Sequence, residues 1–356
     1  MKHLAVFLPS LGGGGAEKVM LTLVEHFTAR GVRCDLVVAI NGGQLTDQVP
    51  PGVRLIEFGK RKTIHAVAAL ANYLRRDKPD ALLATVFSAN TCALLASALA
   101  PGKRRTVVCE SSLSEMAYGD DVSVRVQVNR MLASALYRKA HKIVAISKGV
   151  RESILRTYSV RESDVRIIYN PICSARNLGN GVHKRRDNLL VACGRLEPPK
   201  DYPTMLRAFA RVLQQHDARL RILGQGSLRE VLEQQCADLG ITDRVIFEGF
   251  VRDPGRRMCE ATVFLHTASF EGFGLVLAEA LANGCPVVAT DCPGGVREVL
   301  DGGKYGILVP VGDDAALANA ILSVLRKEVK VSDPSEHLHK FDTECVAEQY
   351  MEVLFQ

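Results

Sequence analysis

The chain has 356 residues, of which 47% are hydrophobic and 24% are charged. That composition is typical of a soluble globular protein, and the length suits two domains better than one. The net charge of +6 is spread unevenly: residues 1–190 hold 28 Lys and Arg against 15 Asp and Glu (+13), and residues 191–356 hold 17 against 24 (−7). We therefore expect the basic half to meet an anionic partner, either a phosphorylated substrate or an anionic membrane face.

Several classes of protein are disfavoured. The chain has no zinc finger, no RNA-binding aromatic signature and no basic helix with heptads, so we expect no nucleic-acid partner. Its ten cysteines are scattered without a C-x-x-C pair, which is typical of free thiols in a reducing cytoplasm. The apolar stretch 81–102 contains polar residues and ends in Pro-Gly, so it indicates a buried strand followed by a core helix rather than a membrane span.

Short apolar runs alternate with longer amphipathic runs along the first half of the chain. This alternation predicts strands at 4–9, 34–39, 53–58, 81–86, 104–110, 142–147 and 165–170, with helices at 16–30, 64–76 and 127–140. A polar segment rich in Gly, Asn and Arg follows. We assign residues 1–176 to an N-terminal domain and 177–188 to a linker.

The same pattern then restarts. It predicts strands at 189–196, 218–226, 244–251, 261–268, 286–290 and 305–311, with helices at 202–216 and 227–240. We assign 189–335 to a C-terminal domain and 336–351 to a helix that packs back towards the N-terminal domain. Residues 352–356, "EVLFQ", match a protease recognition sequence and are interpreted as a tag remnant. The fold class is therefore α/β, with two doubly wound parallel-sheet domains of the Rossmann type.

The first predicted strand runs into a glycine-rich loop, "SLGGGGAEK". Gly13 and Gly14 would let backbone N–H groups approach an anionic ligand closely. The G-x-G-x-x-G spacing of dinucleotide-binding folds is absent, as is the G-K-[ST] of a phosphate-binding P-loop. A nicotinamide dehydrogenase is therefore disfavoured.

Two motifs in the second half carry further charge. "GRLEPPKD" places Arg195 and Lys200 after a strand, and two such cations suit a diphosphate. In "SFEGFGLVLAEALANG", a helix that begins near Gly274 would direct its free N–H groups at a phosphate. Glu271 and Glu279 could accept hydrogen bonds from sugar and ribose hydroxyls, although acids near a helix start are also common without a ligand.

Three motifs follow one another along the chain: G-G-x-x-[KR], G-R-L-x-x-x-K and E-x7-E. Together they resemble family 4 of the retaining glycosyltransferases, and the similarity extends over nearly the whole chain. The resemblance implies the two-domain GT-B fold, with the acceptor bound by the N-terminal domain. It implies transfer of a hexose or N-acetylhexosamine, with retention, from a nucleotide sugar. UDP-sugar is the expected donor, and a lipid-linked or surface-glycan hydroxyl is the expected acceptor. No cofactor or metal is expected, because Arg195 and Lys200 would replace a divalent cation.

The resemblance also implies roles for individual residues. Arg195 and Lys200 would neutralise the donor diphosphate, Glu279 would bind the ribose, and Glu271 would hold the transferred sugar. Glu110 is a candidate catalytic residue on the acceptor side. The remaining implied donor contacts come from the glycine-rich loop, the loop at 249–251 and the segment after Glu271: Gly13, Gly14, Val251, Gly272, Phe273, Gly274 and Leu275.

Two positions depart from the family pattern. His266 stands where small residues or Pro are common, and residues 293–295 read "PGG", which could alter sugar selection. The basic N-terminal half predicts a cytoplasmic enzyme held peripherally at the inner face of the membrane. The alternatives are a sugar-nucleotide epimerase or phosphorylase on the same fold, and a binding module without catalysis.

Overall fold

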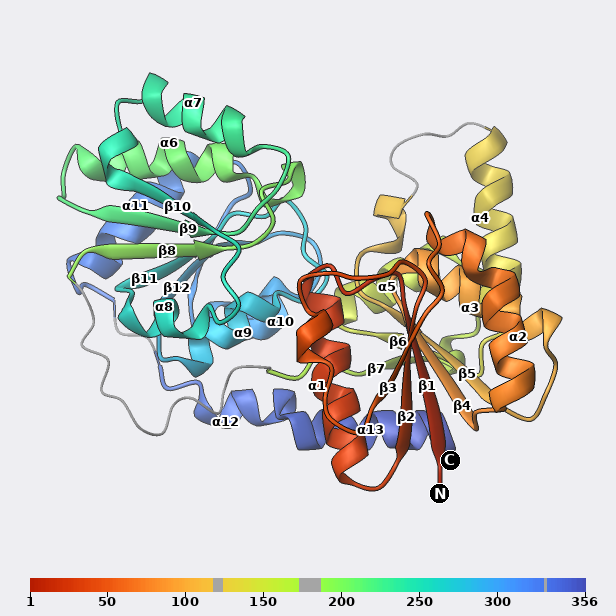
Figure 1. The fold of residues 1–356 in the computed structure, drawn as a ribbon. Coiled ribbons are helices and arrows are strands. Elements are labelled where there is room, and N and C mark those ends of the chain that lie inside the picture. Colours follow the sequence, from red (N-terminus) through yellow and green to blue (C-terminus); the bar gives the residue numbers. More distant parts are fainter. Residues whose placement is uncertain (118–123, 173–186, 330–331) are drawn as a thin grey trace. The chain divides into compact units, whose positions relative to one another are not determined.

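The computed structural model describes residues 1–117, 124–172, 187–329 and 332–356. The chain forms two compact units, one of Met1–Cys173 with Lys340–Gln356 and one of Ser174–His339. Each unit is a parallel sheet covered by helices (Figure 1), which confirms the predicted α/β class with two Rossmann-like domains. Of the predicted linker, only Asp187 and Asn188 lie within the described residues.

The sheet of the first unit has seven parallel strands in the order β3-β2-β1-β4-β5-β6-β7. Its central strands are apolar and buried on both faces, as a sheet with helices on each side requires. The strands are β1 (His3–Leu8), β2 (Arg33–Val38), β3 (Arg54–Glu57), β4 (Ala81–Thr85), β5 (Arg105–Glu110), β6 (Lys142–Ala145) and β7 (Val165–Ile167).

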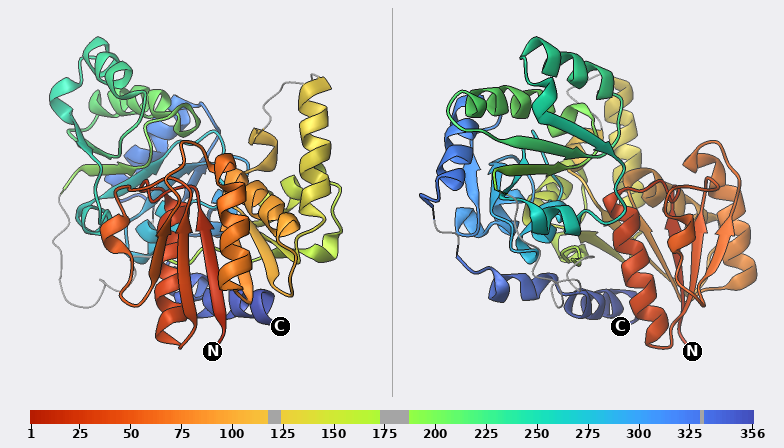
Figure 2. Two further views of the ribbon diagram at one scale, coloured as in Figure 1. Left: turned by 45° about the vertical axis from the view of Figure 1, so that its right-hand side comes forward. Right: turned by 60° about the vertical axis from the view of Figure 1, so that its left-hand side comes forward.

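Helices cover both faces of this first sheet. Helices α1 and α13 lie side by side on one face, and α2 and α3 pack on the other (Figures 1 and 2). The helices of the unit are α1 (Gly15–Ala29), α2 (Val67–Asp77), α3 (Phe87–Leu99), α4 (Val124–Tyr137), α5 (Lys148–Thr157) and α13 (Thr343–Phe355).

The C-terminal segment differs from its sequence-based prediction in two ways. The single helix predicted at 336–351 is interrupted by a 3-10 turn at His339–Phe341, where the buried Phe341 packs edge-on against Tyr169. The interpretation of residues 352–356 as a tag remnant implies that they lie outside the fold, which the structure contradicts. Helix α13 runs to Phe355, and Val353 and Leu354 are buried in the core of the first unit because they continue its apolar face.

The sheet of the second unit has six parallel strands in the order β10-β9-β8-β11-β12-β13. They are β8 (Leu189–Cys193), β9 (Arg219–Leu223), β10 (Val245–Gly249), β11 (Val263–His266), β12 (Val287–Thr290) and β13 (Ile307–Val309). The helices are α6 (Tyr202–Leu213), α7 (Arg229–Asp238), α8 (Gly255–Glu260), α9 (Leu275–Ala282), α10 (Val296–Val299), α11 (Asp314–Leu325) and α12 (Ser335–Leu338).

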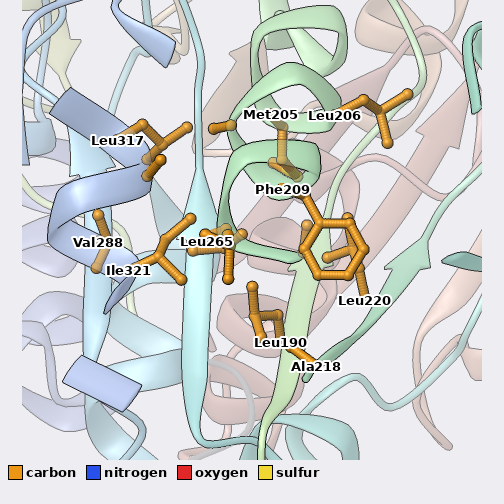
Figure 3. Close-up of a cluster of buried hydrophobic side chains, with 14 of the residues drawn as sticks. Leu190, Met205, Leu206, Phe209, Ala218, Leu220, Leu265, Val288, Leu317 and Ile321 are labelled. Carbon is orange, nitrogen blue, oxygen red and sulfur yellow. The ribbon is translucent and has the colours of Figure 1, made fainter. Parts of the chain in front are cut away.

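The core of the second unit lies between its sheet and the helices α6 and α11. Figure 3 shows Phe209 of α6 and Ile321 of α11 among side chains from β8, β9, β11 and β12, all of them buried. Each such side chain contributes about 1.5–3 kcal/mol by burial. Helices α8 and α9 lie on the opposite face of the sheet (Figures 1 and 2).

The strand order decides where a ligand can bind. In the second sheet the chain moves outwards from β8 to β10 and then returns to the other side of β8 as β11. Open α/β sheets usually bind ligands at the carboxyl edge beside such a reversal, so the loops after β8 and β11 are the expected position of a ligand. The first sheet reverses in the same way between β1 and β4.

Candidate functional site

The loops at the carboxyl edge of the second sheet are joined by backbone hydrogen bonds. The amide of Gly194, just after β8, donates to Leu223 at 2.9 Å, and the amide of Gly224 donates to Gly249 at 2.7 Å. Gly224 has a φ of +144°, and a Cβ there would lie 1.9 Å from the oxygen of Gly194. Only glycine permits this contact, so the loops after β8, β9 and β10 form one continuous platform.

Lys200 occupies a turn that is attached to the loop after β11. The turn Pro198–Lys200 is a 3-10 helix, and its carbonyls accept hydrogen bonds from that loop. Thr267 Oγ1 donates to the oxygen of Lys200 at 2.8 Å, and the amide of Ser269 donates to the oxygen of Pro199 at 2.9 Å. These bonds hold Lys200 at the point where the strand order reverses.

Lys200, Glu271 and His266 meet at this point. Lys200 Nζ donates to Oε2 of Glu271, and the two side chains are 20% and 18% exposed. Nε2 of His266 lies 3.4 Å from the same oxygen, and the His266 side chain is 4% exposed. The structure thus brings the predicted residues Lys200 and Glu271 into direct contact, and it adds His266, which the sequence pattern marked only as a departure.

The protonation state of each group in this cluster depends on its neighbours. Burial alone would raise the pKa of Glu271, but the charge of Lys200 and the neighbouring imidazole outweigh burial and hold that pKa well below its usual range. Burial lowers the pKa of His266, and the charge of Lys200 lowers it further, against the opposing effect of Glu271. Near neutral pH the cluster therefore holds an ionised Glu271 beside a neutral His266.

The "PGG" loop at 293–295 supports the backbone of Glu271. The amide of Glu271 donates to the oxygen of Pro293, and the amide of Gly295 donates to the oxygen of Glu271, both at 3.0 Å. Gly294 has a φ of +118°, and a Cβ there would lie 1.7 Å from the oxygen of Glu271. The two glycines are therefore required by close backbone contact, and an effect of this loop on sugar selection stays a prediction.

Helix α9 begins directly after Gly274, as the motif predicts. Gly274 has a φ of +90°, and its carbonyl accepts from the amides of Leu277 and Ala278 at 2.9 and 3.3 Å. The amides of the first turn, at Leu275 and Val276, are the donors that such a helix start offers to an anion. Glu279 lies within α9 and is buried, so it is not a solvated acid that merely complements the helix dipole.

The other predicted donor contacts lie on neighbouring loops. Gly272 and Phe273 are buried between Glu271 and Gly274. Gly249 ends β10 with a φ of +76°, and the half-buried Val251 follows it. Arg195 is exposed directly after Gly194.

In the first unit, the glycine-rich loop joins β1 to α1. Gly13 has a φ of +103°, and Gly14 is the N-cap of α1. A Cβ on Gly14 would lie 2.3 Å from the carboxylate of Glu17, which therefore folds back over the helix start. Gly43 packs against the same loop, since its Cβ would lie 2.1 Å from the oxygen of Leu11.

Glu110 ends β5 and points into the core of the first unit. The residue is 3% exposed, and its carboxylate accepts hydrogen bonds from the hydroxyl of Tyr137 and, at 3.2 Å, from Nδ2 of Asn90. Tyr137 stacks on Tyr158 with ring centroids 4.5 Å apart. Burial raises the pKa of Glu110 to about 7, although the two hydrogen bonds lower it. Its predicted catalytic role stays a prediction.

Two features, one in each unit, carry only weak signals in the sequence. His266 is the last residue of an apolar strand, and such a pattern favours packing over a role in binding. Val86 follows β4 with a φ of +74°, which is unusual for a β-branched residue, and it lies where the first sheet reverses its strand order. Local periodicity does not report either feature. Among the described residues there is no cluster of His, Cys, Asp and Glu arranged to hold a metal ion.

Comparison with known proteins extends over the whole chain. The Glycosyltransferase Family 4 model matches residues 13–176, and the Glycosyl transferases group 1 model matches residues 187–327. The chain is 28% identical, over 92% of its length and 91% of the relative's, to a Campylobacter jejuni N-acetylgalactosamine-N,N'-diacetylbacillosaminyl-diphospho-undecaprenol 4-alpha-N-acetylgalactosaminyltransferase. It is 26% identical, over 96% of both chains, to the lipopolysaccharide core biosynthesis glycosyltransferase LpsE of Rhizobium meliloti.

Solved structures confirm the fold. Anabaena Alr3699/HepE in complex with UDP and glucose superposes with a TM-score of 0.83 over 99% of both chains, at 22% identity. Staphylococcus aureus TarM superposes with a TM-score of 0.81 over 100% of both chains, at 12% identity. These structures have the GT-B architecture that the motif order predicts. The chain is a glycosyltransferase and belongs to family 4 of these enzymes.

Proposed function

We propose that this enzyme transfers a hexose or N-acetylhexosamine from a UDP-sugar to a hydroxyl of a lipid-linked or surface-glycan acceptor, with retention of the anomeric configuration. The observation that carries the proposal is the contact of Lys200 with Glu271 at the reversal of the second sheet. There a cation for a diphosphate and a carboxylate for sugar hydroxyls stand side by side. UDP and glucose in the Anabaena structure support the donor, and the name of the Campylobacter relative supports a diphospho-lipid acceptor.

In this proposal each loop of the second unit binds a different part of the nucleotide-sugar donor. Arg195 and Lys200 bind the diphosphate, and Glu279 binds the ribose. The base is held by the backbone around Val251. Glu271 and the start of α9 hold the sugar and the adjacent phosphate. That Gly13 and Gly14 contact the same phosphate stays a prediction.

The chemistry follows from the charge that develops at the leaving group. The bond between C1 of the sugar and the diphosphate oxygen breaks while the acceptor oxygen bonds to C1 on the same face. The departing diphosphate gains negative charge, which Arg195, Lys200 and the amides of α9 would stabilise without a divalent metal. In a front-face reaction of this kind the departing phosphate takes the proton of the acceptor hydroxyl.

A two-stage experiment tests the function. Thermal-shift measurements with UDP-, GDP- and ADP-sugars identify the donor, and transfer to a polyprenyl diphosphate glycan is then followed by mass spectrometry. NMR of the product distinguishes retention from inversion. Replacing Arg195 with Ala should lower kcat/KM by about a hundredfold or more, as for loss of one charge-stabilising donor.

Other outcomes of the same experiment would reject parts of the proposal. If the donor alone were converted to another sugar nucleotide, the enzyme would be an epimerase. An unchanged nucleotide affinity after replacement of both Arg195 and Glu279 with Ala would overturn the proposed donor site.

We also propose that the first unit binds the anionic inner face of the cytoplasmic membrane. Residues 122–151 contain seven Lys and Arg and no acid. Within this segment, Met131 and Leu132 on α4 are 71% and 59% exposed, and Arg138 and Lys139 are exposed beside them. Exposed apolar side chains among basic ones suit a surface of anionic lipid. No helix among the described residues has the length and apolar character needed to span a bilayer.

Sedimentation with vesicles at low salt tests this surface. The wild-type protein should sediment with phosphatidylglycerol vesicles and not with phosphatidylcholine vesicles. Replacing Met131 and Leu132 with Ser should reduce that binding. Replacing Val231, which is 60% exposed on α7 of the second unit, is the matched control and should leave binding unchanged. Equal binding to both vesicle types would contradict the proposal.

A further inference from the structure

His266 leaves a buried nitrogen without a hydrogen bond. The residue ends strand β11 and is 3% exposed, and its Nε2 has no hydrogen-bond partner within the part of the chain that the structure describes. An unsatisfied polar atom in the interior costs free energy, so it needs a physical explanation. The candidate explanation is the group that this nitrogen faces.

That group is the carboxylate of Glu271. Nε2 of His266 lies 3.4 Å from Oε2, slightly beyond the usual range for a hydrogen bond from nitrogen to oxygen. The same oxygen already accepts from Nζ of Lys200. A displacement of a few tenths of an ångström towards His266 would bring Oε2 within hydrogen-bonding distance of Nε2.

The proposed function makes Lys200 leave this oxygen. A donor diphosphate carries more negative charge than one carboxylate and would draw Nζ of Lys200 towards itself. Glu271 would then be a largely buried carboxylate without its cation, a costly state unless another donor replaces it. Among the described residues, His266 is the group already placed beside the same oxygen.

We propose that His266 is a positioning residue that donates its Nε2–H to Oε2 of Glu271 when Lys200 engages the donor diphosphate. The hydrogen bond keeps the carboxylate directed at the hydroxyls of the transferred sugar. This inference rests on the proposed donor site. It assigns a specific role to a buried histidine at the end of β11.

Two substitutions distinguish positioning from packing. His266→Leu keeps an apolar side chain of comparable volume but cannot donate, and it should lower kcat/KM for the UDP-sugar about ten- to hundredfold. His266→Gln can donate from its amide and should recover activity to within about threefold of wild type. UDP lacks the sugar, so its affinity should be the same in all three proteins. Urea unfolding midpoints report whether the variants are folded.

A measurement on the unmodified protein keeps the inference testable if a variant fails to fold. With 15N-labelled histidine, the NMR signal of His266 should show a proton on Nε2, and it should shift when the UDP-sugar binds but less when UDP alone binds. A proton on Nδ1 with a bare Nε2 would overturn the inference, because that tautomer cannot donate to Glu271.

The kinetic outcomes are equally decisive. Leu and Gln variants with wild-type kcat/KM, or with equal losses despite normal folding and UDP affinity, would reject a positioning hydrogen bond. If the wild-type enzyme transferred sugar from no nucleotide donor, the proposed function itself would fail. Because that result is read on the wild type, the two failures are distinguishable.

Discussion

Glu110 at the end of β5 and Glu271 in the loop after β11 are both largely removed from solvent, yet their surroundings are opposite. Glu110 accepts from the neutral groups of Tyr137 and Asn90, and burial raises its pKa to about 7. Glu271 contacts the cation of Lys200, and its pKa is held well below the usual range despite burial. Burial by itself therefore does not decide the charge of an acid, because the nature of its partners does.

The first prediction breaks the backbone support of Glu271. Gly294→Ala should lower the free energy of unfolding of the second unit by about 4 kcal/mol, because the new Cβ would collide with the oxygen of Glu271 at a positive φ. Gly302 also has a positive φ of +69° but has open space around it, so Gly302→Ala should cost only about 1 kcal/mol. Urea unfolding followed by circular dichroism measures both. Equal losses of unfolding free energy in the two variants would show that the close contact with the oxygen of Glu271 does not affect stability.

The second prediction removes Lys200, the cation that makes the surroundings of Glu271 different from those of Glu110. Lys200→Met should cost about 3 kcal/mol, because it leaves Glu271 charged, mostly buried and unpaired. Adding Glu271→Gln should restore most of that stability. Lys304→Met is the control, since Lys304 is 58% exposed and lies 4.0 Å from Asp301. If Lys304→Met lost as much stability as Lys200→Met, the ion pair of Lys200 with Glu271 would have no special role.

The pH dependence of that pair has a definite sign. The folded-state pKa of Glu271 is lowered, so its contribution to stability is present above the ordinary value of 4.5 and is lost as the pH falls below it. The Lys200→Met variant should therefore lose less stability than the wild type on acidification, which unfolding midpoints at pH 3 to 6 will show.

The third prediction concerns Glu110, whose effect on the pH dependence of stability has the opposite sign. Its folded-state pKa of about 7 lies above the ordinary 4.5, so folding binds a proton between these values and stability falls as the pH rises through them. Glu110→Gln should abolish that slope and raise the free energy of unfolding at pH 8 by about 3 kcal/mol. Glu25→Gln, at an exposed site of α1, should change nothing. A wild-type stability that is flat from pH 4.5 to 7 would refute a raised pKa.

Much of this fold is predictable from local pattern. Apolar runs such as residues 4–9 and 189–196 form the central strands β1 and β8 because parallel strands are buried on both faces. The start of α9 at Gly274 follows from the glycine in its motif. The interruption at His339–Phe341 was missed because it depends on where Phe341 finds a buried place, which periodicity does not encode.

The candidate site likewise depends partly on local sequence and partly on tertiary structure. Local sequence predicts the residue types and their order: cations after β8, acids around the start of α9, and the intervals that identify the family. Lys200 and Glu271 are 71 positions apart, and folding places Nζ of Lys200 and Nε2 of His266 beside the same oxygen of Glu271. Hydrogen bonds and pKa shifts depend on distances of a few ångströms, and the order of strands in the sheet sets these distances.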